Sequence, residues 1–334
     1  MLASVITAVF NGEKYLQESI ESILNQTIKE IEFIIVNDGS TDSTKDILDA
    51  ITDKRVKIIH LEKNLGAANA LNTGITYAKS DWIAIQDADD ISMPTRIEEQ
   101  LLHVSKNPHL VGVSSLVECI KGNIPVSPSI FYGEQTLYNI VLNKEDNFNS
   151  RFYNCYVCHG SVMFSKEAFQ RVNGYNPHFK ISYDYDLWLR LYDIYPIEKI
   201  NRILYQYRVL PNSLGKRSKS DTISELMTSV IHFIGNSIIS NKKKNNPSFV
   251  VLGSKKGCSF VMKKVKLKEE INIMKFLDGG KNRSKKIALE YYNQGLIDGI
   301  IILNNKNAQH LIDYFLDRGL IFNQDVFKIW NYKF

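Results

Sequence analysis

The sequence predicts an α/β fold, with a mostly parallel sheet flanked by helices on both faces. Apolar, β-branched runs alternate with segments of helical periodicity from residue 2 to residue 85. Asn, Asp or Gly follow the runs and mark turns. Because a helix lies between each pair of strands, we expect the strands to be parallel neighbours.

The elements of this first part follow directly from the pattern. The expected strands are 2–10, 31–36, 56–61 and 82–85, and helices are expected from residue 16, after Ser43 as the helix cap, and over 67–78. In such sheets ligands bind beyond the carboxyl ends of the strands. Four polar residues lie just after the strands, so one ligand could meet them together: Asn11, Asp38, Asn64 and Asp87.

The later part of the chain is more mixed. We expect helices at 94–107, 166–172, 184–195 and 305–318, strands at 110–120, 157–164 and 197–207, and a mobile excursion over the site at 121–150. After Ser213 the composition changes to Lys, Asn and Ser. We therefore predict a domain of residues 1–215 and a smaller, basic, mainly helical region of residues 216–334 whose role is unknown.

The charge of the chain is unevenly distributed. Of its 334 residues, with a net charge of +5, residues 216–286 hold 17 Lys or Arg against 5 Asp or Glu, a local +12, so the remainder sums to −7. This asymmetry suggests an anionic partner for the basic segment, with membrane surface, nucleic acid and polyanionic glycan all open. A solvated lysine-rich helical face explains it equally well.

The N-terminal segment and the cysteines indicate a cytoplasmic protein. Met1 to Phe10 lacks a basic region, and its apolar run is too short for a signal peptide. The apolar stretches are shorter than the roughly 18 residues that a membrane span needs. Four cysteines do not form a disulfide framework in a chain of this size.

The acidic turn Gln86 to Asp90 is the strongest single chemical signal. It brings Asp87, Asp89 and Asp90 together at the end of an apolar strand. Crowded carboxylates repel one another unless a cation lies among them, and oxygen ligands suit a hard ion such as Mg²⁺ or Mn²⁺. The alternative is a solvated acidic turn that caps the following helix.

Five blocks of sequence then point to a known family. Over roughly residues 1–215 the chain resembles the family 2 glycosyltransferases, which have the GT-A fold. Each block alone is weak evidence, but all five occur in the family's order. The matching blocks are VITAVFNGEKYLQESIESILNQT (5–27), IIVNDGSTDST (34–44), NLGAANALNTGI (64–75), QDADD (86–90) and DYDLWLRL (184–191).

This resemblance implies a site for a nucleoside-diphosphate sugar, with UDP-sugars favoured. It implies that Asp38 contacts the base, that Asp87 lies near the ribose, and that Asp89, in a DXD motif, binds the metal between the two phosphates. Asp90 is then a helix cap or a partner of these side chains. For Asp38 an Asx turn with a helix cap is the alternative, and for Asn64 a turn role. The expected nucleotide-sugar contacts are Val9, Asn11, Asp38, Asn64, Gly66, Asn72, Asp87, Ala88 and Arg208.

On the acceptor side, the resemblance implies that Asp184 is the catalytic base. The family usually has Glu at the position of Tyr183, which is one departure. His159, Tyr183 and Trp188 are the acceptor-side candidates, although we expect His159 to be buried and satisfied and Trp188 to belong to the core. Asp186 is interpreted as a structural helix residue.

A second departure lies at Leu210, where the family often has His. Leucine cannot assist a metal or a diphosphate. Arg208, Lys216 and Arg217 remain as candidate partners of the diphosphate, on what we expect to be a mobile loop.

These observations favour an inverting, metal-dependent glycosyltransferase, transferring a hexosyl or N-acetylhexosaminyl group to a glycan or lipid-linked glycan in surface polysaccharide synthesis. The alternatives are a sugar nucleotidyltransferase, for which the basic phosphate loop is missing after the first strand, and a glycan-binding protein with a degenerate site. Peripheral association with anionic membrane at the inner face of the cell membrane and homo-oligomerisation are left open. No nucleic-acid partner is expected.

Overall fold

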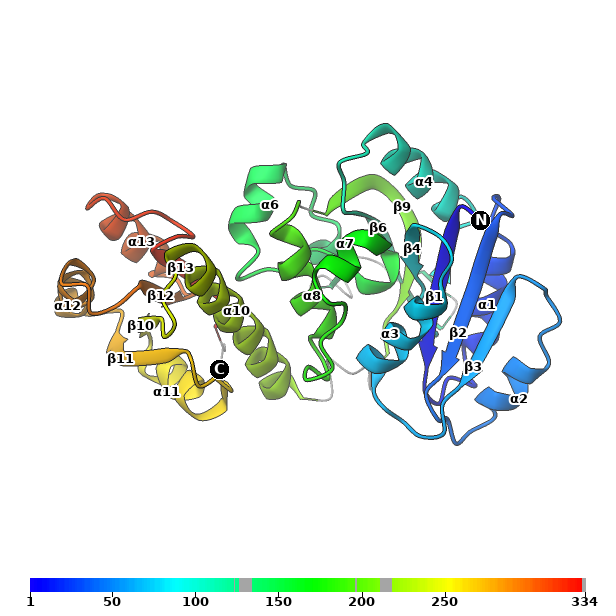
Figure 1. Cartoon of the computed structure of the whole chain (residues 1–334), viewed down its shortest axis with the longest axis horizontal. Coiled ribbons are helices and arrows are strands. Elements are labelled where there is room, and N and C mark those ends of the chain that lie inside the picture. Colours follow the sequence, from blue (N-terminus) through cyan, green and yellow to red (C-terminus); the bar gives the residue numbers. More distant parts are fainter. Residues whose placement is uncertain (123, 126–133, 196, 211–217, 332–334) are drawn as a thin grey trace. The chain divides into compact units, whose positions relative to one another are not determined.

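A computed structural model describes residues 1–122, 124–125, 134–195, 197–210 and 218–331, and Figure 1 shows the chain. The chain divides into two compact units. Unit 1 comprises Met1–Asn147 and Cys155–Ser213, and unit 2 comprises Phe148–Asn154 and Leu214–Phe334. The predicted boundary near residue 215 lies outside the described residues.

Unit 1 is built on one large, mostly parallel sheet, as predicted. Its strands are ordered β3-β2-β1-β4-β8-β6-β9-β5, with β7 paired to β6. The first four positions are parallel, and β8 joins β4 and β6 in antiparallel fashion. The strands are β1 (Ala3–Val9), β2 (Ile31–Asn37), β3 (Val56–His60), β4 (Trp82–Ile85), β5 (Ile91–Ser92), β6 (Gly112–Lys121), β7 (Ile124–Pro125), β8 (Met163–Ser165) and β9 (Glu198–Arg208).

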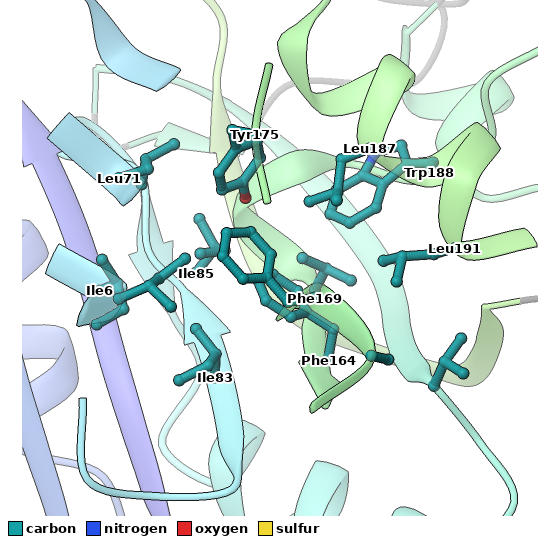
Figure 2. Close-up of a cluster of buried hydrophobic side chains, with 14 of the residues drawn as sticks. Ile6, Leu71, Ile83, Ile85, Phe164, Phe169, Tyr175, Leu187, Trp188 and Leu191 are labelled. Atoms are coloured by element: carbon teal, nitrogen blue, oxygen red, sulfur yellow. The ribbon is translucent and has the colours of Figure 1, made fainter. Parts of the chain in front are cut away.

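Side chains that alternate along the strands give the sheet two buried faces. On one face Ile6, Ile83 and Ile85 pack with side chains of α3, α7 and α8, as Figure 2 shows. On the other face Val5 and Ala84 pack with α1, α2 and α4. The helices are α1 (Leu16–Leu24), α2 (Thr44–Asp49), α3 (Ala67–Tyr77), α4 (Arg96–Lys106), α5 (Glu134–Tyr138), α6 (Lys144–Ser150), α7 (Lys166–Arg171) and α8 (Tyr183–Tyr192).

Three local predictions had different outcomes, and only the strand at 157–164 was wrong. Residues 157–164 do not form one strand, because the 3-10 turn η1 (His159–Ser161) precedes β8. The expected excursion at 121–150 contains β7, α5 and α6, while residues 123 and 126–133 lie outside the described part. Ser43 is the N-cap of α2, but its side chain makes no cap hydrogen bond.

Unit 2 contains a second, smaller parallel sheet that the sequence analysis did not predict. Its strand order is β11-β10-β12-β13, and every pairing is parallel. Short apolar runs in a lysine- and asparagine-rich region do not distinguish strand from helix. The elements are α10 (Lys219–Lys242), β10 (Ser248–Gly253), α11 (Lys255–Lys264), β11 (Asn272–Asp278), α12 (Asn282–Asn293), β12 (Gly299–Leu303), α13 (Ala308–Leu316) and β13 (Val326–Ile329).

Two further expectations concern the whole chain. None of the described helices combines the length and the apolar composition needed to traverse a lipid bilayer. The four cysteines, Cys119, Cys155, Cys158 and Cys258, are free thiols.

Candidate active site

The ends of three adjacent parallel strands define one edge of the sheet in unit 1. β2, β1 and β4 lie side by side, and the loops that follow them are tied together. The backbone N–H of Asp38 donates to the carbonyl of Val9 at 2.8 Å, and the Thr7 hydroxyl donates to the carbonyl of Gln86 at 2.7 Å. The expected polar residues therefore meet at this edge.

Asn11 links the loops after β1 and β2. Its backbone is in the left-handed region, with φ of 55°, which asparagine tolerates better than most residues. Its side-chain oxygen accepts from the Thr41 N–H at 2.8 Å, and its own N–H donates to the Ser40 hydroxyl at 2.9 Å. The two loops thus form one rim of the site.

Asp38 is committed to the backbone of the loop before α3. Its two carboxylate oxygens accept from the N–H groups of Leu65 and Gly66, at 2.7 and 2.9 Å, and the residue is 2% exposed. Each oxygen keeps a second lone pair, so the expected contact with a base would be additional to these bonds. The first role of Asp38 in this conformation is to position the loop.

The side chains of three other expected nucleotide contacts pack against or bond to other parts of the protein. Val9 is 3% exposed and belongs to the core, and Ala88 packs against the same core. Asn72 is bonded on both sides to the backbone of Tyr175, donating to its carbonyl at 2.8 Å and accepting from its N–H at 3.0 Å. These side chains therefore support the site from behind. Asn64 is exposed beside Gly66, whose φ of 90° forms the turn into α3.

The acidic turn after β4 is anchored through Asp87. One carboxylate oxygen of Asp87 lies 2.9 Å from Nδ1 of His159. The backbone N–H of Asp87 donates to the Tyr205 hydroxyl at 3.2 Å, and its carbonyl accepts from the Ser19 hydroxyl at 2.9 Å. The turn is thus connected to α1, η1 and β9.

Burial and the neighbouring carboxylates disfavour the ionised forms of Asp89 and Asp90. Burial, followed by the charge of Asp87, raises the pKa of Asp89 from 3.8 to about 6. Burial, followed by the charges of Asp89 and Asp87, raises the pKa of Asp90 well above its ordinary value. One oxygen of Asp90 accepts from the Arg208 N–H at 2.6 Å, and the other is buried without a partner among the described residues. Asp90 does not cap α4, because the N-cap of that helix is Thr95.

Arg208 is not on a loop, which corrects one prediction. It ends β9, and its side chain is fully buried. Its Nε donates to the carbonyl of Asp89 at 2.6 Å, its guanidinium pairs with Glu18 at 2.9 Å, and it also donates to the carbonyl of Gly122. Arg208 therefore braces the acidic turn. Leu210 is half-buried just beyond it, and Lys216 and Arg217 lie outside the described residues.

A buried arginine supports the same turn from the core side. Arg96 is fully buried and donates to the carbonyls of Ile85 and Val162, at 2.6 and 3.2 Å, and to the Ser92 hydroxyl at 2.8 Å. Burial lowers its pKa to about 10. Because these acceptors come from three segments, Arg96 fixes the end of β4 in place.

His159 connects the acidic turn to an aromatic cluster. Its Nε2 lies 3.1 Å from the Tyr175 hydroxyl, and its ring packs edge-on against Tyr183, with centroids 5.5 Å apart. Burial acts to lower the pKa of His159, but the charge of Asp87 and the bond to it outweigh burial, so the pKa is raised. The expectation of a satisfied histidine is confirmed, although the side chain remains 10% exposed.

Gly160 is required by the close approach of β9. A Cβ added at this position would lie 1.9 Å from the Tyr205 hydroxyl and 2.8 Å from a carboxylate oxygen of Asp87. Only glycine therefore allows η1 to pack against the acidic turn.

Asp184 lies in the first turn of α8, close enough to His159 for their charges to interact. One oxygen accepts from the Tyr185 N–H at 2.7 Å. Burial raises the pKa of Asp184, with the charge of His159 opposing this effect and that of Asp87 adding to it. Tyr183, the first residue of α8, packs edge-on against His159, and the charge of His159 acts on the neighbouring Asp184.

Trp188 and Asp186 have structural roles, as we favoured. Trp188 is 1% exposed and packs in the core with Phe164, so it offers no surface to an acceptor. Asp186 pairs with Arg190 one turn along the same helix, and Arg190 also donates to the carbonyl of Gly174 at 2.7 Å. The pair holds the turn before α8.

The oxygen-rich acidic turn fits a divalent cation in part. Within the described residues no three side chains of His, Cys, Asp or Glu converge as a complete metal site. A cation beside Asp89 would stabilise the ionised form of this carboxylate, which burial and the charge of Asp87 disfavour. Mg²⁺ or Mn²⁺ commonly binds through one or two carboxylates and substrate phosphates. The chain thus supplies part of a ligand set.

Sequence reasoning missed several supporting side chains. Tyr205, Tyr175 and Glu18 contact the site residues, but their sequence signals are weak. Tyr205 could have been flagged by the alternation of Tyr205 and Tyr207 in β9. Nothing local distinguishes Tyr175 or Glu18 from surface residues.

Comparison with known proteins identifies the family. Residues 4–172 match the family described as "Glycosyl transferase family 2". The O-antigen biosynthesis glycosyltransferase WbnJ of Escherichia coli is 32% identical over 254 residues, covering 70% of this chain and 95% of that protein. The chain belongs to glycosyl transferase family 2. It is therefore a glycosyltransferase that acts on nucleotide sugars.

Solved structures of this glycosyltransferase class share the fold. Residues 1–349 of Staphylococcus aureus TarS, in complex with UDP-GlcNAc, give a TM-score of 0.56 at 18% identity, covering 71% of this chain and 67% of that chain. The mannosyltransferase PcManGT of Pyrobaculum calidifontis, in complex with GDP-Man and Mn²⁺, gives 0.52 at 17% identity, covering 71% and 64%. Unit 1 accordingly has the GT-A fold.

Proposed function

We propose that this glycosyltransferase is inverting and metal-dependent, and that it transfers a hexose or N-acetylhexosamine from a UDP-sugar to a hydroxyl of a glycan or lipid-linked glycan. The observation that carries the proposal is the gathering of Asp87, Asp89, His159 and Asp184 beyond the end of β4. These groups are suited to a diphosphate leaving group on one side and to proton removal on the other.

The donor would lie along the rim formed by the loops after β1 and β2. Asp38 holds the Leu65–Gly66 turn there, and Asn11 joins the neighbouring loop. Asp87 would lie near the ribose, with His159 orienting its carboxylate. The UDP-GlcNAc complex of TarS supports a uridine donor.

Asp89 would hold the divalent cation, Mn²⁺ or Mg²⁺. A cation there offsets the charge that develops on the departing diphosphate. The Mn²⁺ complex of PcManGT supports this choice. Arg208 donates to the backbone carbonyl of Asp89 and would thereby hold the Asp89 carboxylate in position, without itself contacting the donor.

Asp184 would accept the proton of the attacking hydroxyl. In an inverting transfer the acceptor oxygen bonds to the anomeric carbon while the bond to the diphosphate breaks, and a carboxylate takes the released proton. The raised pKa of Asp184 makes it a stronger base than an exposed aspartate. Tyr183, which precedes Asp184 in α8, packs edge-on against Tyr175, with ring centroids 5.7 Å apart.

The acceptor would belong to surface polysaccharide synthesis, as the O-antigen relative supports. A lipid-linked acceptor would require the enzyme to work in the cytoplasm at the inner face of the membrane. Peripheral association with anionic lipid satisfies that requirement. Homo-oligomerisation is a separate proposal for residues 216–334.

A donor panel tests the proposal. UDP-, GDP- and dTDP-sugars are incubated with the protein, with and without Mn²⁺, and nucleoside diphosphate release is measured. We expect metal-dependent release from a UDP-sugar. Synthesis of the nucleotide sugar from a sugar phosphate would favour the nucleotidyltransferase instead, and UDP binding without turnover of any donor would favour the degenerate-site alternative.

A matched pair of variants then tests the base. Asp184→Asn should lower transfer by 10²–10⁴-fold, the usual contribution of a general base. Asp193→Asn, an exposed change at the end of the same helix, should leave the rate unchanged. Equal rates for the two variants would refute the role of Asp184.

A further inference from the structure

A compact group of exposed lysines and apolar side chains lies at the end of α11 and in the segment that follows. We call it the Lys–Met surface, and it consists of Met262, Lys263, Lys264, Lys266, Leu267 and Lys268. All six residues are exposed and belong to unit 2, where α11 is drawn in yellow in Figure 1. Glu269 and Glu270 follow directly and limit the surface on one side.

The backbone of this segment is held in place by α10. The Ser224 hydroxyl donates to the carbonyl of Lys264 at 2.6 Å, and the N–H of Lys266 donates to the Thr228 hydroxyl at 3.3 Å. Nε2 of His232 lies 2.8 Å from the carbonyl of Lys266. Three successive turns of α10 therefore hold the backbone at Lys264 and Lys266 in place.

One face of α11 is already packed within unit 2. Gly257, Cys258, Phe260 and Val261 are buried against the small sheet, so α11 has one apolar face already in use. Met262, which is 64% exposed, lies in the last turn of α11 next to these buried positions, and Leu267, which is 36% exposed, lies in the segment that follows the helix. Large apolar side chains among four cations mark a surface that contacts an amphipathic partner.

We propose that the Lys–Met surface docks the protein on an anionic lipid bilayer. Four ammonium groups would meet the acidic headgroups, while Met262 and Leu267 would enter the boundary between headgroups and acyl chains. This proposal deepens the membrane association put forward with the proposed function and supplies the residues that make the contact.

The composition of the surface favours lipid over nucleic acid. Single-stranded nucleic acid binds on aromatic side chains that stack with bases, and the six residues include none. The flexible apolar side chains of Met262 and Leu267 suit the boundary between lipid headgroups and acyl chains better than the edge of a base pair. Charge complementarity alone would permit either partner, so the apolar pair decides between them.

Co-sedimentation of the full chain with vesicles tests the proposal without any donor or acceptor. Vesicles of phosphatidylcholine are compared with vesicles that also contain phosphatidylglycerol. We expect binding to the anionic vesicles only, weakening as salt rises. Replacing Lys263, Lys264, Lys266 and Lys268 with Gln should lower the partition coefficient by about 600-fold, since each surface lysine contributes roughly a fivefold gain.

Two variants separate this surface from a general effect of charge. A control that replaces Lys281, Arg283, Lys286 and Lys306 with Gln removes as much charge from exposed sites elsewhere in unit 2 and should bind within a few-fold of the wild type. The double variant Met262→Ser, Leu267→Ser should lose tight binding while keeping a weak, salt-sensitive attraction.

Several outcomes would overturn the proposal. They are equal loss in the two lysine variants, no preference of the wild type for anionic vesicles, or tight binding to a DNA duplex without binding to vesicles. Nucleotide-sugar hydrolysis should be unchanged in all these variants. Because hydrolysis is measured separately, loss of vesicle binding and loss of the proposed catalytic activity are distinguishable.

Discussion

Replacing Asp89 with Asn should stabilise the metal-free protein and remove its stabilisation by Mn²⁺. Asp89 has a pKa raised to about 6 because burial and the charge of Asp87 disfavour its ionised form. When no cation is bound, the folded protein is destabilised by the free energy needed to ionise this buried carboxylate. Asparagine has nearly the same shape without the charge, so the variant isolates the electrostatic effect.

The magnitude follows from the shift in pKa. Each tenfold change in the ionisation constant corresponds to about 1.4 kcal/mol. Moving the pKa from 3.8 to about 6 therefore costs the folded state up to about 3 kcal/mol when Asp89 is ionised. Asp89→Asn should recover up to that amount. The variant should also relieve Asp90, whose pKa is raised in part by Asp89.

The pH dependence has a definite sign. The folded state binds the Asp89 proton more tightly than the unfolded state, so the wild type loses stability as the pH rises from about 4 to about 6 and carries the full cost above that range. Thermal unfolding in EDTA, followed by fluorescence at pH 5 and pH 8, measures the difference. The variant should melt higher at pH 8, with a smaller gain at pH 5.

Adding Mn²⁺ with UDP at pH 8 provides the second half of the test. The wild type should gain stability with metal concentration, as expected for a ligand that binds only the folded state, and Asp89→Asn should not. Asp81→Asn, an exposed change just before β4, is the control and should follow the wild type throughout. Destabilisation by Asp89→Asn at pH 8, or an equal gain with Mn²⁺ in both proteins, would refute the reasoning.

Three further predictions concern the residues around the acidic turn. Arg208→Met should lower the free energy of unfolding by about 1–3 kcal/mol for each carbonyl left unpaired, at Asp89 and Gly122. Urea denaturation measures this change, and an unchanged free energy of unfolding would contradict the bracing role. Asn72→Ala should destabilise the protein by a similar amount, because both backbone groups of Tyr175 lose their partner. His159→Gln removes the imidazolium that opposes the rise in the pKa of Asp184, so the acid limb of the rate–pH profile should move to higher pH; an unmoved limb would exclude this coupling.

Local patterns in the sequence were sufficient for the first sheet and for the position of the site. Alternating apolar runs and helical segments indicate which residues are buried and that β1 to β4 are parallel. The position of β4 beside β1, and not beside β3, was decided by the tertiary structure. The acidic turn could be placed at a strand end because β4 is an uninterrupted apolar run. β10 and β12 are equally uninterrupted apolar runs, but in a region rich in Lys and Asn they were interpreted as parts of helices and not as strands of a second sheet.

The partners of the polar side chains required the tertiary structure. Asp38 bonds to a loop 27 residues away, and Asp90 bonds to Arg208 across 118 residues. A local pattern reports the direction in which a side chain points, but not which distant backbone group meets it. The sequence alone therefore determined the family, the GT-A sheet and the carboxylates at its edge, whereas folding decided that Arg208 braces the acidic turn and that His159 joins Asp87 to the cluster around Asp184, because only the folded chain brings their partners within hydrogen-bonding distance.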